Sequence, residues 1–378
     1  MKKITVNTEE LKKAIEKLYK VVARKSDNDV LKNILLNADT ESGELFITAS
    51  NLTQFARMKI PADITSTVQF VFSETKTILK AMKFFTADNI TLEYIEEQKD
   101  DKGKIIKAGE VNIICGEKKA KQKIIESELF PAFPEISEEL LNDCHYSNAK
   151  LKERFDAISY APLTGETPRS ILKGVHFCKS DMVTTDNYRL VLNKDESFEV
   201  ETSFTIPCDT LKYVNQVLEE ELHIISDIKF IKFTDNNGST IITRLYESDY
   251  IDYRRVLKNE GKYRITIDVK NYVENLKYLK TIAPGKIEAQ WYKNKIGAEA
   301  DKGEYESEVY AIGEMPFEIA FNIDYMIEAL CRFKNKVIIT LDSEIKPMMI
   351  TSEEDINNVA LILPVRPKTN KMFEKITS

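Results

Sequence analysis

Tyr250-Ile251-Asp252-Tyr253-Arg254-Arg255-Val256-Leu257 is the stretch that decides how the chain divides. Two adjacent guanidinium groups cannot both be buried without partners, so we expect this stretch to be an exposed connector and not a core strand. On either side of it the same order recurs: an amphipathic helix, strands, a second amphipathic helix and more strands. The recurring units begin near residues 6, 146 and 267, which are 140 and then 121 residues apart. This spacing is too long for a solenoid and predicts three similar domains.

The composition is typical of a globular protein. Of the 378 residues, 43% are hydrophobic and 30% are charged, and no apolar run approaches the ~20 residues that span a bilayer. The basic start, Met1-Lys2-Lys3, is followed by Asn7-Thr8-Glu9-Glu10 and not by the apolar core of a signal peptide. We therefore expect the protein to act in the cytoplasm, with no membrane partner.

The cysteines and histidines form no metal-binding or redox pattern. The five cysteines are far apart and never form a Cys-x-x-Cys pair, and the three histidines are scattered. We expect no disulfide framework, no metal site, no cofactor and no histidine-based catalysis.

Two helices expected in the first unit each separate an apolar face from a basic face. After Asn7, a helical spacing relates Leu11, Ile15, Leu18 and Val22 on one side, and Lys13, Lys17, Lys20 and Arg24 on another. After Ser73, the corresponding sets are Ile78 and Met82, and Lys76, Lys80 and Lys83. The net charge of −7 comes from acidic clusters such as Glu219-Glu220-Glu221, which we expect in loops or outer edges. One lysine stripe alone is usually a solvated face, but its presence on both helices favours a surface for phosphates.

Several motifs, in order along residues 1 to about 367, resemble the bacterial sliding clamp, the β subunit of DNA polymerase III. They are Ile4-Thr5-Val6-Asn7, Leu31-Lys32-Asn33-Ile34, Phe130-Pro131-Ala132-Phe133-Pro134-Glu135, Thr167-Pro168-Arg169-Ser170-Ile171-Leu172-Lys173-Gly174-Val175, Val183-Thr184-Thr185-Asp186-Asn187-Tyr188-Arg189-Leu190, Asp252-Tyr253-Arg254-Arg255-Val256-Leu257 and Leu363-Pro364-Val365-Arg366. The last two correspond to the family's seam and terminal strand.

The resemblance implies an α+β fold of three repeated DNA-clamp domains, each with two inner helices and two outer antiparallel sheets. The domains would span residues 1–128, 136–252 and 258–367, and residues 368–378 would form a mobile C-terminal extension. Two copies would close head to tail into a ring around duplex DNA, held without reading bases. Such a DNA polymerase processivity factor for DNA replication needs no catalytic residue. The DNA-facing residues would be Lys13, Lys17, Lys20, Arg24, Lys25, Lys76, Lys80, Lys83 and Arg169.

The resemblance also implies a pocket for short linear peptides of the polymerase, the clamp loader and other proteins. Its residues would be Leu172, Thr185, Asn187, Tyr188, Arg189, Leu190, Ile251, Arg255, Val256, Leu361, Leu363, Pro364, Val365 and Arg366. The family usually has Gly-His where this chain has Asn187-Tyr188, and Pro where it has Ile251, so we expect a different peptide preference. In the homodimer, Tyr278 and Leu279 would contact residues 119–125 of the second copy.

Two other readings stay open. A clamp-fold protein that has lost the ring would be a monomeric peptide-binding adaptor. Ser73-Glu74-Thr75-Lys76 satisfies the Ser-x-x-Lys pattern of penicillin-binding acyl-transferases, but no Lys-Thr-Gly accompanies it and Ser73 is well placed as a helix cap.

Overall fold

The computed structural model describes residues 2–99, 105–258, 261–285, 287–300, 303–366 and 372–373. The chain forms two compact units, one made of residues 1–152 and 209–245 and the other of residues 153–208 and 246–378. The middle repeat is shared between them because its strands continue the sheets of its neighbours: β19 pairs with β4 in the first unit, and β15 pairs with β28 in the second. The three domain limits drawn from the sequence stay a prediction.

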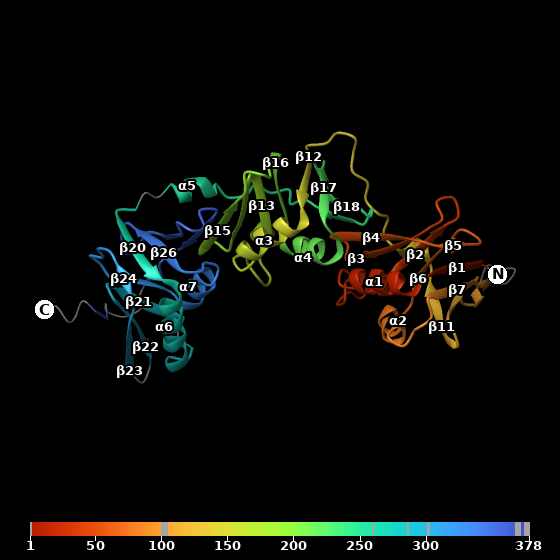
Figure 1. Cartoon of the computed structure of the whole chain (residues 1–378), viewed down its shortest axis with the longest axis horizontal. Helices are drawn as coiled ribbons and strands as arrows, with labels where there is room; N and C mark the ends of the chain where they lie inside the picture. The colour runs from red at the N-terminus through yellow and green to blue at the C-terminus, as the bar shows by residue number, and fades with distance from the viewer. Residues whose placement is uncertain are drawn as a thin grey trace. The chain divides into compact units, whose positions relative to one another are not determined.

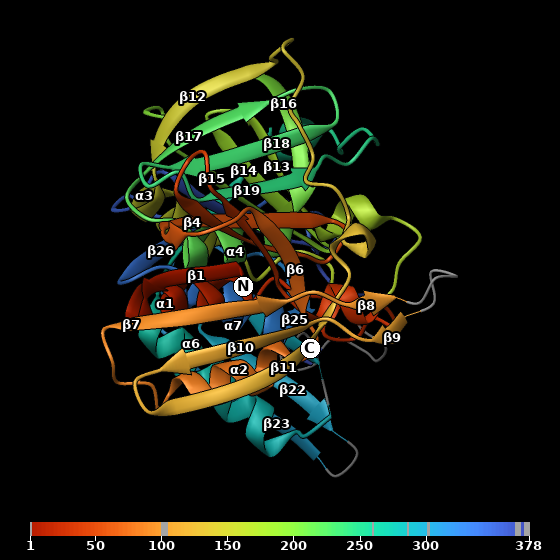
Figure 2. The same cartoon turned by 90° about the vertical axis from the view of Figure 1, so that its right-hand side faces the viewer.

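The first unit contains antiparallel strands and the helices that cover them (Figure 1). Its elements are β1 (Lys2–Asn7), α1 (Thr8–Leu18), β2 (Leu35–Asp39), β3 (Glu44–Ser50), β4 (Gln54–Pro61), β5 (Asp63–Ile64), β6 (Val68–Phe72), α2 (Thr75–Met82), β7 (Asn89–Ile95), β8 (Gln98–Lys99), β9 (Ile105–Lys107), β10 (Glu110–Cys115), β11 (Lys118–Ile125), β12 (Asn142–Ser147), the first half of α3 (Asn148–Ile158), α4 (Cys208–Val217), β17 (Glu221–Ser226), β18 (Phe230–Asp235) and β19 (Thr240–Arg244). One sheet runs in the order β12-β17-β18-β19-β4-β3-β2-β6-β11-β10-β7-β1-β5. Figure 2 shows β7, β10 and β11 side by side.

Helix α1 confirms the amphipathic pattern. Asn7 caps its start, because the Asn7 side chain accepts hydrogen bonds from the backbone N–H groups of Glu9 and Glu10 at 3.0 and 3.1 Å. Leu11, Ile15 and Leu18 are fully buried, and the helix packs on β1, β3, β4 and α2 (Figure 1).

The predicted cap of α2 is wrong. The helix begins at Thr75, its N-cap Glu74 makes no side-chain cap hydrogen bond, and Ser73 lies one residue further out. The backbone N–H of Thr75 donates instead to the Asn33 side chain, at 2.7 Å. Asn33, which is 42 residues from Thr75 in the chain, therefore makes the hydrogen bond that the sequence predicted from Ser73. Ile78 and Met82 are buried as expected.

The second unit is built from two antiparallel sheets, β16-β13-β14-β15-β28-β27-β26-β20-β24 and β23-β22-β21-β25, and their helices. Its elements are the second half of α3, β13 (Gly174–Lys179), β14 (Asp181–Thr185), β15 (Arg189–Lys194), β16 (Val200–Pro207), α5 (Tyr253–Leu257), β20 (Tyr263–Asp268), α6 (Val269–Ile282), β21 (Glu288–Tyr292), β22 (Lys295–Ala300), β23 (Gly303–Glu308), β24 (Ala311–Ile312), β25 (Ile319–Asn322), α7 (Ile323–Leu330), β26 (Lys336–Leu341), β27 (Met348–Thr351) and β28 (Asn358–Ile362).

The core of the third repeat lies between these sheets and α6 and α7. Trp291 and Tyr272 are fully buried with ring centroids 5.5 Å apart, in an edge-to-face arrangement that suits aromatic quadrupoles. The Trp291 indole N–H donates to the carbonyl oxygen of Lys293 at 2.8 Å, so this buried donor is satisfied.

No helix among the described residues is long and apolar enough to cross a membrane.

Candidate functional site

One apolar cluster joins three segments that are far apart in the sequence. Strand pairing places Leu190 of β15 opposite Leu361 of β28, and the backbone N–H of Leu363 donates to the Tyr188 carbonyl at 2.8 Å. Tyr253 of α5 completes the buried cluster, with Tyr250, Ile251, Leu257 and Leu363 packed against it. The predicted pocket residues of these segments therefore meet in one place.

Several of the predicted pocket residues are buried in the core of the second unit. Leu172, Thr185, Leu190 and Leu361 are each at most 3% exposed. Two others are accessible: Tyr188 is 62% exposed and Val256 38%. Asn187 holds a left-handed backbone with φ of 76°, and its N–H donates to the Thr185 hydroxyl at 3.1 Å. Asn tolerates this conformation, so the tight turn presents Tyr188 outward.

Arg189 is paired with several groups of the second unit. Its guanidinium donates to Asp186 at 3.0 Å, to the Tyr160 carbonyl at 2.6 Å and to Glu328 of α7. It also lies 4.2 Å from the Tyr325 ring centroid, and the residue is only 9% exposed. Two carboxylates and the Tyr325 ring satisfy the charge of Arg189 within the fold, and its contact with a peptide stays a prediction.

The charged residues of the seam, Asp252, Arg254 and Arg255, are exposed as expected, and one buried tyrosine anchors the stretch. Tyr253 is 4% exposed, and its hydroxyl donates to Asp181 at 2.6 Å. Burial and this carboxylate raise the pKa of Tyr253. Arg254 donates to the same carboxylate at 3.0 Å. Both guanidinium groups are therefore exposed, that of Arg254 is also paired with Asp181 of β14, and the stretch forms a short helix.

His176 lies beneath the seam as a neutral core residue. Its ring stacks on Tyr250 with centroids 4.3 Å apart and shares a 2.9 Å hydrogen bond with Thr205. Burial lowers the pKa of His176 to about 4, so the ring is uncharged at neutral pH.

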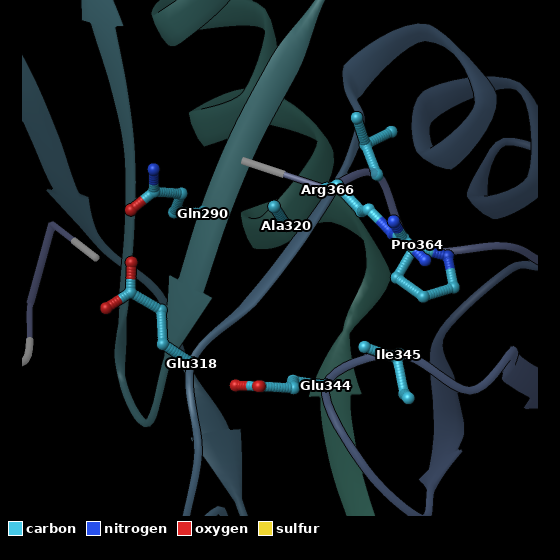
Figure 3. Close-up of a pocket in the computed structure, with 8 residues that line it drawn as sticks. Gln290, Glu318, Ala320, Glu344, Ile345, Pro364 and Arg366 are labelled. Carbon is cyan, nitrogen blue, oxygen red and sulfur yellow. The ribbon is translucent and has the colours of Figure 1, made fainter. Parts of the chain in front are cut away.

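A pocket of about 420 Å³ opens in the second unit beside residues 364–366, which follow β28. Figure 3 shows Pro364 and Arg366 on one side of it and Gln290 and Glu318 on the other. Pairing of Gln290 with Ala320, and a 2.8 Å hydrogen bond from the Val365 N–H to the Ala320 carbonyl, fix the two walls. Of the predicted residues, those in this pocket are Pro364, Val365 and Arg366.

The sequence did not identify the other lining residues of this pocket, which are Gln290, Glu318, Ala320, Glu344 and Ile345. Ile345 is 73% exposed, whereas Glu318 is only 4% exposed. A buried acid ahead of a strand has no local signature, because its burial depends on strands from elsewhere in the chain.

The basic face of α1 in the first unit is partly neutralised. Glu219, after α4, forms ion pairs with Lys13 at 2.7 Å and Lys17 at 2.8 Å, and Lys17 also donates to the Val217 carbonyl at 2.9 Å. The hydrogen bonds from Lys13 and Lys17 lower the pKa of Glu219 to about 2. Glu219 lies in the loop between α4 and β17, as expected of this acidic cluster, but it pairs with the basic face of α1, so the two charges are less separated than predicted. DNA contact by Lys13 and Lys17 stays a prediction.

The remaining basic residues are accessible. Lys20, Arg24 and Lys25 line a cleft of about 660 Å³ that Lys212 and Tyr213 of α4 close. Lys76 and Lys80 of α2, and Lys83 directly after it, are exposed, and no ion pair joins them to any residue in the described part of the chain. Arg169, in the second unit, is exposed just before a short 3₁₀ helix at Ser170–Lys173.

The predicted interface residues differ in exposure. Tyr278 is 49% exposed, but Leu279 is fully buried in the α6 core and has no surface to offer a second copy. Two edge strands carry opposite charge instead. Along residues 118–123, β11 pairs with β10 alone and contains Lys118, Lys119, Lys121 and Lys123. In the second unit, β23 is the edge strand of its own sheet, pairs with β22 alone and contains Glu304, Glu306 and Glu308.

The described residues contain no group of three or more His, Cys, Asp or Glu side chains that could hold a metal ion. In the Ser-x-x-Lys pattern, Ser73 is half-buried and Lys76 is exposed, so these two residues do not form a buried acyl-transfer centre.

Comparisons with known proteins point to one family. The profile described as DNA polymerase III beta subunit, N-terminal domain, matches residues 2–132, and its C-terminal domain profile matches residues 254–366. The beta sliding clamp of Synechococcus elongatus is 21% identical over 392 residues, covering 96% of this chain and 99% of the relative. That of Caulobacter vibrioides is 23% identical over 357 residues, covering 86% and 89%.

Solved structures agree on the fold. The Thermotoga maritima DNA polymerase III β subunit has a TM-score of 0.83 with 21% identity, covering 97% of this chain and all of its own. The Bartonella birtlesii sliding clamp, solved bound to griselimycin, has a TM-score of 0.84 with 18% identity and covers 97% and 100%.

Proposed function

Because this chain belongs to the DNA polymerase III β subunit family, we propose that it is a sliding clamp: a non-catalytic dimeric ring that encircles duplex DNA and tethers replication proteins to it. We further propose that it acts in the cytoplasm, where bacterial DNA is replicated. The observation that carries the proposal is the exposed basic surface of the first unit.

That basic surface suits binding without sequence preference. Lysine and arginine side chains that project from helices and a turn can reach phosphates, but they do not insert an element into a groove to read bases. We assign DNA contact to Lys20, Arg24 and Lys25 after α1, to Lys76 and Lys80 on α2, and to Lys83 directly after it. Lys13 contributes less because Glu219 shares its charge.

The edge strands support a head-to-tail dimer. An unpaired edge offers backbone groups to another strand, and opposite charges select the partner. We propose that β11 of one copy meets β23 of a second copy, with Tyr278 at the same contact. A contact between two different edges closes into a ring when the rotation fits.

The peptide site is proposed at the pocket of Pro364, Val365 and Arg366, with the accessible Tyr188 and Val256 as further contacts. A mostly apolar pocket with a few polar groups suits an extended peptide with an apolar anchor. Griselimycin, which is bound to the Bartonella birtlesii clamp, is the probe that we choose for it.

Native mass by light scattering, followed through dilution, tests the ring first. We expect a mass near twice 43.5 kDa. Reversing the charge of β23 with Glu304→Lys and Glu306→Lys should give monomer, and a control with Glu353→Lys, at an exposed loop residue, should stay dimeric.

Retention on DNA tests encirclement. After loading by a clamp loader, the protein should stay on closed circular DNA in high salt and leave when the circle is cut, because the hold is topological. A monomer at every concentration, with no retention on circles but with griselimycin bound, would favour the monomeric peptide-binding adaptor.

A further inference from the structure

Met372 and Phe373 lie beyond the last strand, yet they are buried in the second unit. Their exposed fractions are 9% and 4%, so the expectation of a mobile extension does not hold for this pair. The other residues of the predicted extension lie outside the described part of the chain.

A built site receives this pair. The Met372 N–H donates to the Gln290 side-chain oxygen at 2.7 Å and to Glu318 Oε1 at 2.9 Å, and the Phe373 N–H donates to Glu318 Oε2 at 2.9 Å. Glu318 is 4% exposed, and a buried carboxylate is costly unless it accepts hydrogen bonds. Both of its oxygens are satisfied here by backbone N–H groups of the chain's own end.

A glycine makes room for the two side chains. A Cβ at Gly297 of β22 would lie 2.6 Å from the Met372 sulfur and 3.0 Å from the Phe373 ring. Any larger residue would therefore push against the pair. Gln290, Gly297 and Glu318 form a recess that we call the C-terminal dock.

The C-terminal dock shares two side chains with the peptide pocket. Gln290 and Glu318 also form one wall of that pocket, opposite Pro364 and Arg366 (Figure 3). Their acceptor oxygens are the polar groups on this wall that a peptide N–H could reach, and the N–H groups of Met372 and Phe373 already use them.

We propose that Met372 and Phe373 are an intramolecular ligand that competes with partner peptides for the wall formed by Gln290 and Glu318. The inference rests on the proposed peptide pocket and adds its regulation. A ligand that contacts Gln290 and Glu318 must displace Met372 and Phe373. Only the molecules in which this pair is undocked therefore bind the ligand at full strength. If about nine molecules in ten are docked, the apparent affinity falls about tenfold.

The test uses the full chain in four forms: wild type, Phe373→Ser, Gly297→Val and a control, Ile356→Ser, which changes an apolar residue that is 79% exposed. Phe373→Ser removes an apolar side chain from the docked pair, and Gly297→Val fills the space on β22 that the pair occupies. One variant remains informative if the other misfolds. Hydrogen exchange reports the Met372 and Phe373 amides, and calorimetry reports griselimycin affinity.

We expect protected amides in wild type and control, fast exchange in both dock variants, and griselimycin binding about tenfold tighter in those variants. Unprotected amides in wild type would refute the dock. If the amides are protected in wild type and exchange fast in both dock variants, but all four forms bind griselimycin equally, the competition is refuted. If no form binds griselimycin, both the proposed peptide pocket and the competition are refuted. Protection of the Met372 and Phe373 amides still shows separately whether the pair docks.

Discussion

Replacing Glu219 with glutamine should both destabilise the first unit and strengthen its hold on DNA. In the folded chain, Glu219 accepts hydrogen bonds from Lys13 and Lys17, and these lower its pKa from the ordinary 4.5 to about 2. At about 1.36 kcal/mol per pH unit, this difference sets an upper limit of about 3 kcal/mol on the stabilisation. Because the Glu219 side chain is 39% exposed, solvent screening reduces the expected loss to about 1 kcal/mol.

The pH dependence has a definite sign. A carboxylate whose pKa falls on folding stabilises the fold above its unfolded pKa, and the stabilisation disappears as pH falls through the folded pKa. The contribution of Glu219 should therefore be complete above about pH 4.5 and lost on the way down to about pH 2. Urea unfolding of both proteins at pH 7 and at about pH 3 measures it, and the difference should shrink by about half or more.

The matched control is Glu221→Gln, which removes the same charge from an exposed neighbour in β17. DNA binding is measured as a function of salt, and freeing Lys13 should steepen the slope of log K against log salt by about 0.9. Lys17 should contribute less, because it keeps its bond to the Val217 carbonyl. Equal stability, pH response and salt slope in the two variants would refute the role assigned to Glu219.

Three further changes test other parts of the molecule. Alanine at Lys76, Lys80 and Lys83, which lie on or directly after α2, should reduce the salt slope of DNA binding by about 2.7. An unchanged slope would mean that these lysines do not face phosphates. Arg189→Met should cost about 3 kcal/mol in urea unfolding because it leaves Asp186 charged and buried; a loss below about 1 kcal/mol would contradict the structural role. Tyr253→Phe should cost about 1 kcal/mol through its bond to Asp181 and leave the native mass unchanged, and a larger loss would show that α5 itself detaches.

The sequence was sufficient for features that depend on near neighbours. The buried face of α1 follows from the spacing of Leu11, Ile15 and Leu18, and its cap follows from Asn7, because helix periodicity and capping are decided within a few residues. The presence of strands was recognisable for the same reason, whereas their antiparallel sheets were predicted from the family resemblance. The family resemblance added the pocket residues at the chain's terminal strand, of which Pro364 and Arg366 do line a pocket.

What the tertiary structure decided is which charged groups are free. The sequence gives Lys17 and Arg189 as basic side chains, but it does not show that Glu219 lies 2.8 Å from Lys17 across 202 residues of chain, or that Glu328 pairs with Arg189. Likewise, nothing near Glu318 predicts that Met372 and Phe373 bind it. Burial and ion pairing depend on distances between segments that only folding brings together. The sequence alone therefore determined the helices and strands, and the tertiary structure determined which of their side chains remain available for function.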